Sequence, residues 1–125
     1  PYWQSAHSVL RTMTVAGPYM AQHPAAEIAG LRVGPAVTVG PRVVDGTVAL
    51  PGVVGDALDI VAQFDLTRSN ATSFGVSVRR DPSAAGDAVD AVYTPATRTI
   101  MDGWFAGMAP QPGGPGTVQL RILVD

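Results

Sequence analysis

The sequence contains no cysteine and no lysine, and only 14% of its 125 residues are charged. Without cysteine, the chain has no disulfide framework, no thiolate zinc site and no cysteine nucleophile. The absence of cysteine does not indicate whether the protein is located in an oxidising or a reducing compartment. The eight basic residues are all arginines, and they are scattered along a chain with a net charge of −2. They form no basic stripe that could neutralise phosphates, so we expect no nucleic-acid partner.

Long hydrophobic runs are also absent. No run approaches the roughly 18–20 apolar residues that a helix needs to cross a bilayer. Residues 1–5 lack the basic-then-apolar pattern of a secretory signal peptide. We therefore expect a soluble chain without a membrane partner, whose targeting segment has been removed or never stood at this position.

The residues that are present favour a β-rich globular fold. Hydrophobic residues make up 46% of the chain, and its length has room for one domain with a substantial core. The 14 glycines and 11 prolines recur every few residues and leave little space for long helices. We expect an all-β fold, namely a two-sheet antiparallel β-sandwich of the jelly-roll or concanavalin-like type.

Apolar and polar residues alternate most clearly over residues 57–66, which predicts a strand with one buried face. Residues 73–80 show the same period, and the polar connection 67–72 between the two runs predicts a turn that joins them as a hairpin. The apolar positions of the two runs are Leu58, Ile60, Ala62, Phe64, Leu66, Phe74, Val76 and Val78.

Further strands are expected at residues 8–15, 37–39, 42–50 (around the turn dipeptide Asp45-Gly46), 88–93, 98–101 and 117–124. Together they make roughly eight or nine short strands, at the spacing of a sandwich. A short helix of about two turns is predicted to begin at Pro24 and to run through Leu31. The Gly- and Pro-rich residues from Gly103 to Gly116 predict a loop.

The predicted elements suggest a division of the chain. We expect residues 1–32 to be a connecting segment with the first strand and the short helix, and residues 33–125 to be the β-sandwich module. The strong strand at residues 118–125 ends without a turn that would shield its edge. We therefore expect a continuing strand, either in the same polypeptide or from another chain.

The polar residues do not form a recognisable site. His7 and His23 lack the spaced partners that catalysis or metal binding would require, so we interpret both as surface or packing residues. The carboxylates show no calcium-loop spacing, and we interpret them as solvated faces or turns. They are Asp56, Asp59, Asp65, Asp87, Asp90 and Asp102. We assign no catalytic, cofactor-binding or metal-binding residue to this chain, and no cofactor.

Three aromatic residues could contact a ligand. Trp3, Trp104 and Phe105 could stack on a sugar ring or pack against another domain, and we favour packing. Asn70-Ala71-Thr72 matches the N-glycosylation pattern, which matters only in a eukaryotic secretory context.

Several segments resemble the C-terminal module of glycoside hydrolase family 32, the family of invertases, levanases, inulinases and fructosyltransferases. Residues 55–65 (GDALDIVAQFD) and 73–80 (SFGVSVRR) are similar to that family's strand pair G-x-x-L-E-I-x-x-x-F and F-G-x-x-V-R. Residues 93–100 (YTPATRTI) resemble its Y-D-x-x-x-x-x-L hairpin, and residues 118–125 (VQLRILVD) resemble its L-R-I-F-V-D strand. The connection at residues 3–32 resembles the stretch that opens with a Trp and ends in L-x-Q-x-P-x-x-E-L-x-x-L-R.

This resemblance implies an accessory, stabilising β-sandwich beside a catalytic β-propeller domain or companion chain. In the family, the propeller supplies the nucleophile, the acid/base and the stabilising aspartate of a retaining double displacement on fructan or sucrose. The parent protein would then be a secreted β-fructosidase or fructosyltransferase, and this chain alone would not be an enzyme. The module could also form a homodimer. We expect an extracellular rather than a cytoplasmic location.

The triplet Arg80-Asp81-Pro82 is also a hallmark of the catalytic half of such enzymes. Here it ends a predicted strand and enters a polar turn, and glycoside hydrolysis needs two carboxyl groups that face one bond. No second carboxylate motif lies near it, so we interpret it as a solvated turn. Two alternatives to the accessory role stay open, namely a free-standing lectin-like sandwich that binds carbohydrate and a purely structural interaction module.

Overall fold

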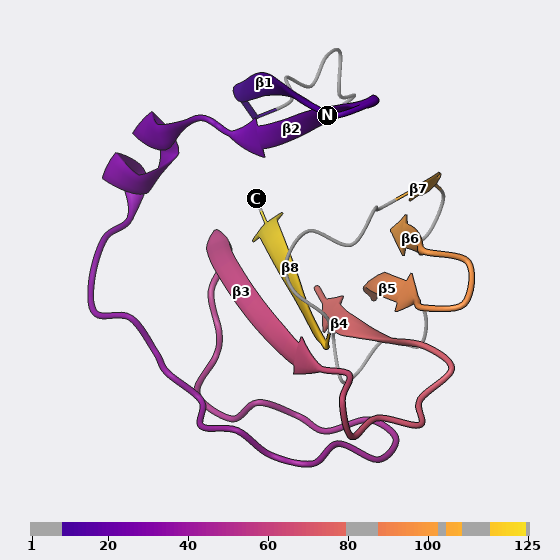
Figure 1. Cartoon of the computed structure of the whole chain (residues 1–125). Coiled ribbons are helices and arrows are strands. Elements are labelled where there is room, and N and C mark those ends of the chain that lie inside the picture. Colours follow the sequence, from indigo (N-terminus) through magenta and orange to yellow (C-terminus); the bar gives the residue numbers. More distant parts are fainter. Residues whose placement is uncertain (1–8, 80–87, 103–104, 109–115, 125) are drawn as a thin grey trace. The chain divides into compact units, whose positions relative to one another are not determined.

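The computed structural model describes residues 9–79, 88–102, 105–108 and 116–124 (Figure 1). The chain divides into two compact units, residues 1–52 and 53–125, and each is described by itself. The division expected from the sequence, after residue 32, stays a prediction.

The first unit contains an antiparallel hairpin. Strand β1 (Arg11–Ala16) pairs with β2 (Tyr19–Pro24). The chain reverses at Gly17, whose φ of 61° lies in the left-handed region that glycine adopts without steric cost. The Ala25 N–H extends the ladder by donating to the Leu10 carbonyl over 2.9 Å. The strand expected at residues 8–15 is therefore confirmed as β1, whereas β2 was not expected.

A short helix follows the hairpin. The segment η1 (Ala26–Leu31) is a 3-10 helix, and the Ile28 N–H donates to the Ala25 carbonyl over 3.1 Å. A short helix was expected here, but its predicted start was wrong because Pro24 is the last residue of β2. Proline suits the end of an edge strand as well as a first helical turn, and the hairpin register decides between the two positions.

The strands expected at residues 37–39 and 42–50 are wrong. Residues 32–57 belong to no strand or helix, and all of them except Val53 are exposed. Gly34, Gly46 and Gly52 have positive φ values and turn the chain repeatedly. The valines between these turns have strand propensity, but no neighbouring strand in the described part of the chain pairs with them.

The described residues of the second unit form two antiparallel sheets. Strand β3 (Leu58–Asp65) pairs with β8 (Thr117–Val124), the last strand of the chain. The other sheet follows chain order through β4 (Phe74–Val78), β5 (Val89–Thr94), β6 (Thr99–Asp102) and β7 (Phe105–Met108). The expectation of an all-β fold is confirmed, because the described residues form antiparallel sheets and only one short helix.

The hairpin expected between residues 57–66 and 73–80 is wrong. Both segments form strands, but β3 pairs with β8 and β4 pairs with β5. Beyond the ladder, the Leu66 N–H donates to the Gly116 carbonyl over 2.5 Å and extends the pairing with β8. The expected loop from Gly103 to Gly116 also contains a strand, β7. Alternation predicts which face of a strand is buried, but it does not specify the neighbouring strand.

Side chains from both sheets share one hydrophobic cluster. Tyr93 on β5 and Val118 and Leu120 on β8 are its buried centre. Phe64, Leu66, Phe74 and Ile100 are partly buried against it. The ring centroids of Phe64 and Phe74 lie 4.5 Å apart, and those of Phe74 and Tyr93 lie 5.5 Å apart. Both distances are in the range of favourable aromatic pairs. The predicted inward faces of β3 and β4 are therefore confirmed.

Candidate functional site

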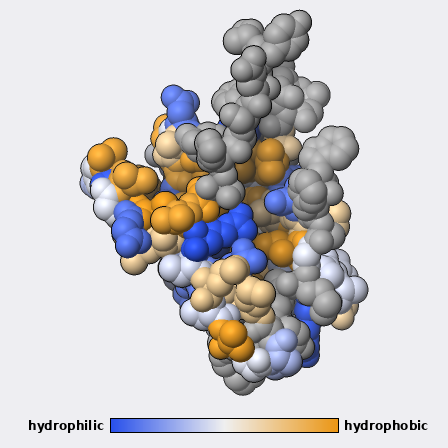
Figure 2. Space-filling view, turned by 90° about the horizontal axis from the view of Figure 1, so that it is seen from above, coloured by the Kyte–Doolittle hydropathy of each residue, from blue (hydrophilic) through white to orange (hydrophobic). Residues whose placement is uncertain are grey.

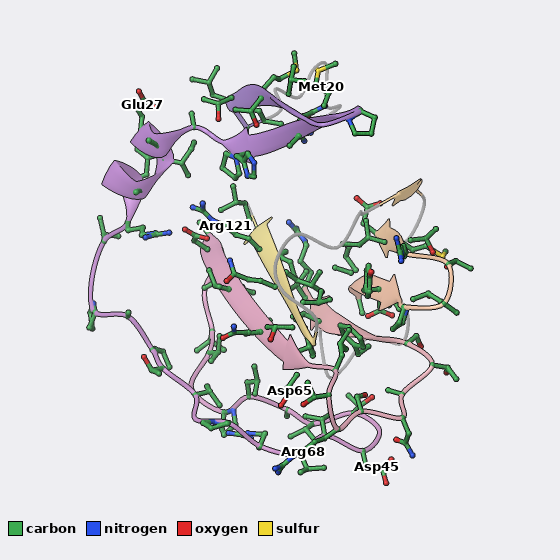
Figure 3. All side chains as sticks on the ribbon, viewed as in Figure 1. Met20, Glu27, Asp45, Asp65, Arg68 and Arg121 are labelled. Carbon is green, nitrogen blue, oxygen red and sulfur yellow. The ribbon has the colours of Figure 1, made fainter. Side chains whose placement is uncertain are left out.

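The outer face of the β3–β8 ladder carries an ion pair. Arg121 on β8 donates from Nε and Nη2 to the two carboxylate oxygens of Asp59 on β3, each over 2.9 Å. This two-point geometry is the strongest form of a guanidinium–carboxylate contact. The hydrogen bond to Asp59 raises the pKa of Arg121 above its ordinary value. The pair joins two neighbouring strands and so stabilises their pairing. Figure 3 labels Arg121.

Asp65 lies at the end of β3 and organises the next turn. Its Oδ1 accepts hydrogen bonds from the Thr67 hydroxyl over 2.5 Å and from the Thr67 backbone N–H over 2.9 Å. These two hydrogen bonds hold the pKa of Asp65 below its usual value, and the bond from the Thr67 hydroxyl has the larger effect. The arrangement is a local side-chain-to-backbone turn. A carboxylate held ionised in this way is a poor general acid, and Figure 3 shows it at the end of β3 away from Arg121.

Asp90 and His23 lie on strands of different units. The Ser77 hydroxyl donates to Asp90 over 2.5 Å, across directly opposed positions of β4 and β5. His23 is exposed on β2, in the other unit. Within the described residues, no three histidine or acidic side chains gather in a way that could hold a metal ion. These contacts are those of a solvated sheet surface.

Some sequence candidates cannot be placed. Trp3, His7, Asp87, Trp104 and the triplet at residues 80–82 lie outside the described residues. The backbone of Phe105 belongs to β7, but its side chain also lies outside them. The choice between sugar stacking and packing for these aromatic residues therefore stays a prediction.

The possible glycosylation triplet lies in an exposed loop. Asn70 and Thr72 are both exposed, and the Ala71 N–H donates to the Ser69 hydroxyl over 3.2 Å. A glycosylation acceptor needs such a position, but the loop geometry does not show that Asn70 is modified.

Exposed apolar side chains form the most distinctive surface feature. On one face of the β1–β2 hairpin, Met13, Val15 and Met20 are 63%, 85% and 63% exposed. Val15 and Met20 are directly opposed in the register, so they share that face. Figure 2 shows hydrophobic side chains in several groups that hydrophilic ones interrupt. Sequence reasoning missed this surface because it did not expect β2.

Comparison with known proteins identified no similar protein. No protein-family model, no curated protein and no solved structure matches the chain. In the described part of the chain, no helix is both long enough and apolar enough to span a membrane.

Proposed function

We propose that this chain is the accessory β-sandwich of a retaining β-fructosidase that acts on fructan or sucrose. The observation that carries the proposal is the similarity of residues 55–65 and 73–80 to the strand pair of glycoside hydrolase family 32. The segments with this similarity include β3 and β4, whose Phe64 and Phe74 rings are in contact. The similarity rests on strand pattern, since no family model matches the chain.

The hydrophobic cluster supports the sandwich part of the proposal. It unites residues of β3 and β8 in one sheet with residues of β4, β5 and β6 in the other. Two sheets that share a core through their inner faces are the defining feature of a sandwich. The jelly-roll type would require further strands in addition to those described.

The polar contacts favour a supporting role over a catalytic one. Asp59 binds Arg121, Asp65 binds Thr67 and Asp90 binds Ser77. Glycoside hydrolysis needs a pair of carboxyl groups that flank one bond, and these three carboxylates each serve a local contact. In this proposal, the catalytic carboxylates belong to a β-propeller domain or companion chain, which also binds the substrate.

The exposed apolar residues support contact with such a partner. A two-stranded hairpin is marginally stable alone in water, and the hairpin β1–β2 presents Met13, Val15 and Met20 without cover from the described residues of its unit. Burial of this face against an apolar surface would stabilise both partners. Because polymeric fructan is encountered outside cells, the proposal includes secretion of the parent protein.

The first test is to determine the intact mass and the N-terminal sequence of the native protein. The second is to assay this protein for fructose release from sucrose, levan and inulin. The proposal expects a larger parent polypeptide, or a tightly bound companion chain, that releases fructose. A lone, inactive species of 12.9 kDa would contradict it. Glycan binding by that lone species would instead support a lectin-like module.

A further inference from the structure

Within the described residues, one edge of strand β3 pairs with another strand and the opposite edge has no strand beside it. In the described part of the chain, β3 pairs only with β8. The Leu66 N–H donates to Gly116, which continues that ladder. Successive residues of a strand direct their N–H and C=O groups to opposite edges. Because the backbone of Leu66 bonds to the strand partner, the backbone groups of the even-numbered residues of β3 also point to β8. The backbone groups of Val61 and Gln63 therefore point to the open edge.

An open edge of this kind is a template for another strand. We propose that a second copy of this chain pairs with β3 through this edge, antiparallel and with Val61 on the two-fold axis. The Val61 N–H and C=O groups of the two copies would bond to each other, and Gln63 of each copy would lie opposite Asp59 of the other. The dimer depends on the β3 edge and is independent of the proposed function.

The side-chain pattern of β3 favours this register over the two that differ from it by one residue. Centring the pairing on Val61 places Leu58 opposite Phe64 and Ile60 opposite Ala62, so the inner face of each strand continues into that of the other. A shift that centres the pairing on Ala62 would place Asp59 opposite Asp65, and like charges directly opposed are destabilising. A shift to Ile60 would place Asp56 opposite Phe64 on the apolar face.

The outer face also favours a contact at Val61. Its side chain is 55% exposed although it lies in the middle of a strand, and the symmetric pairing brings two such side chains together. The carboxylate of Asp59 is drawn toward β8 by Arg121, over 2.9 Å. An equivalent pairing of β8 that was centred on Arg121 would oppose two guanidinium groups, which disfavours that register of β8.

The dimer should be weak, because a single strand pair covers less than the roughly 800 Å² per partner of a stable interface. The first experiment is analytical ultracentrifugation of the chain from about 10 μM to about 1 mM, a range that spans weak association. We expect the weight-average mass to rise with concentration toward twice 12.9 kDa. A mass that stays at 12.9 kDa throughout this range would overturn the proposal.

Two matched substitutions test which surface is used. Val61→Lys places two like charges on the axis and should raise the dissociation constant at least about fivefold. Val89→Lys adds the same charge at a 41% exposed position of β5 and should leave the dissociation constant unchanged. Circular dichroism of both variants establishes that they are folded. Equal dissociation constants for the two folded variants would refute pairing through β3.

A cysteine scan tests the register, since the natural chain has no cysteine. Two Val61→Cys residues would have Cα atoms about 5.5 Å apart, within the range that a disulfide spans. Two Gln63→Cys residues would lie four positions apart along the strand, about 13 Å, which is out of reach. Mild oxidation should therefore cross-link only the Val61→Cys chain. Cross-linking of Gln63→Cys alone would show a different register and contradict the proposal.

Discussion

At the scale of single residues, Gly75 is the described glycine with the least room for a side chain. It lies on β4, where a Cβ atom would overlap the backbone of Ala91 on β5. The nearest atom would be the Ala91 carbonyl oxygen. Its φ is not in the left-handed region, so the requirement for glycine comes from the close approach of two strands. Sequence periodicity had only placed Gly75 on the outer face of its strand.

We therefore expect Gly75→Ala to lower the free energy of unfolding by about 1–3 kcal/mol, the range for overpacking. The control is Gly107→Ala on β7, where a Cβ atom would meet nothing within 4 Å. Urea unfolding of both variants measures the difference. A destabilisation by Gly107→Ala as large as that by Gly75→Ala would contradict the explanation.

Arg98 has a backbone conformation that is uncommon for a residue other than glycine. It ends the turn between β5 and β6 with a φ of 53°, and its N–H donates to the Pro95 carbonyl over 3.3 Å. A left-handed conformation costs an L-residue roughly 1–2 kcal/mol, whereas glycine adopts it freely.

Arg98→Gly should therefore raise the free energy of unfolding by about 0.5–1 kcal/mol, after the greater flexibility of glycine in the unfolded chain is included. The control Ala96→Gly, in the same turn but without a positive φ, should lower it. Thermal unfolding compares the two variants. If Arg98→Gly destabilises as much as Ala96→Gly, the left-handed conformation of Arg98 does not carry the expected cost.

At the scale of elements, Phe64 connects the two sheets. It projects from β3 into the shared cluster and contacts the ring of Phe74 on β4 at 4.5 Å. Because the cluster has few fully buried members in the described residues, each large side chain contributes a considerable share of its apolar contacts.

Phe64→Ala should lower the free energy of unfolding by about 2–4 kcal/mol, somewhat below the cost for a fully buried ring. Gln63→Ala, on the opposite face of β3, should change it by less than about 0.5 kcal/mol. Chemical denaturation monitored by tyrosine and tryptophan fluorescence gives both values. Similar values for the two variants would show that the inner face of β3 does not hold the sheets together.

At the scale of the whole molecule, hydrogen bonding is unevenly distributed. Residues 58–65 and 117–124 form a continuous ladder, whereas residues 33–50 belong to no strand or helix and are exposed throughout. Amide exchange is slow where opening requires the loss of a cooperative ladder and fast where the backbone faces water.

Hydrogen exchange followed by mass spectrometry should therefore label peptides from residues 33–50 at nearly the rate of the urea-unfolded chain. Peptides from β3 and β8 should be protected by comparison. Strong protection of residues 33–50 would show that this segment forms structure that the exposed conformation lacks. The same experiment at high and low protein concentration would show whether β3 gains protection on association.

The sequence alone determined the all-β class, the presence of strands β1, β3, β4, β5, β6 and β8, and the inward faces of β3 and β4. These features depend on local alternation and on frequent glycine and proline, which act over a few residues. Only the tertiary structure decided that β3 pairs with β8, that residues 37–50 form no strand and that Asp59, Asp65 and Asp90 contact Arg121, Thr67 and Ser77, respectively. Such outcomes depend on which distant segments supply hydrogen bonds and apolar contacts, because a strand is stable only beside a neighbour.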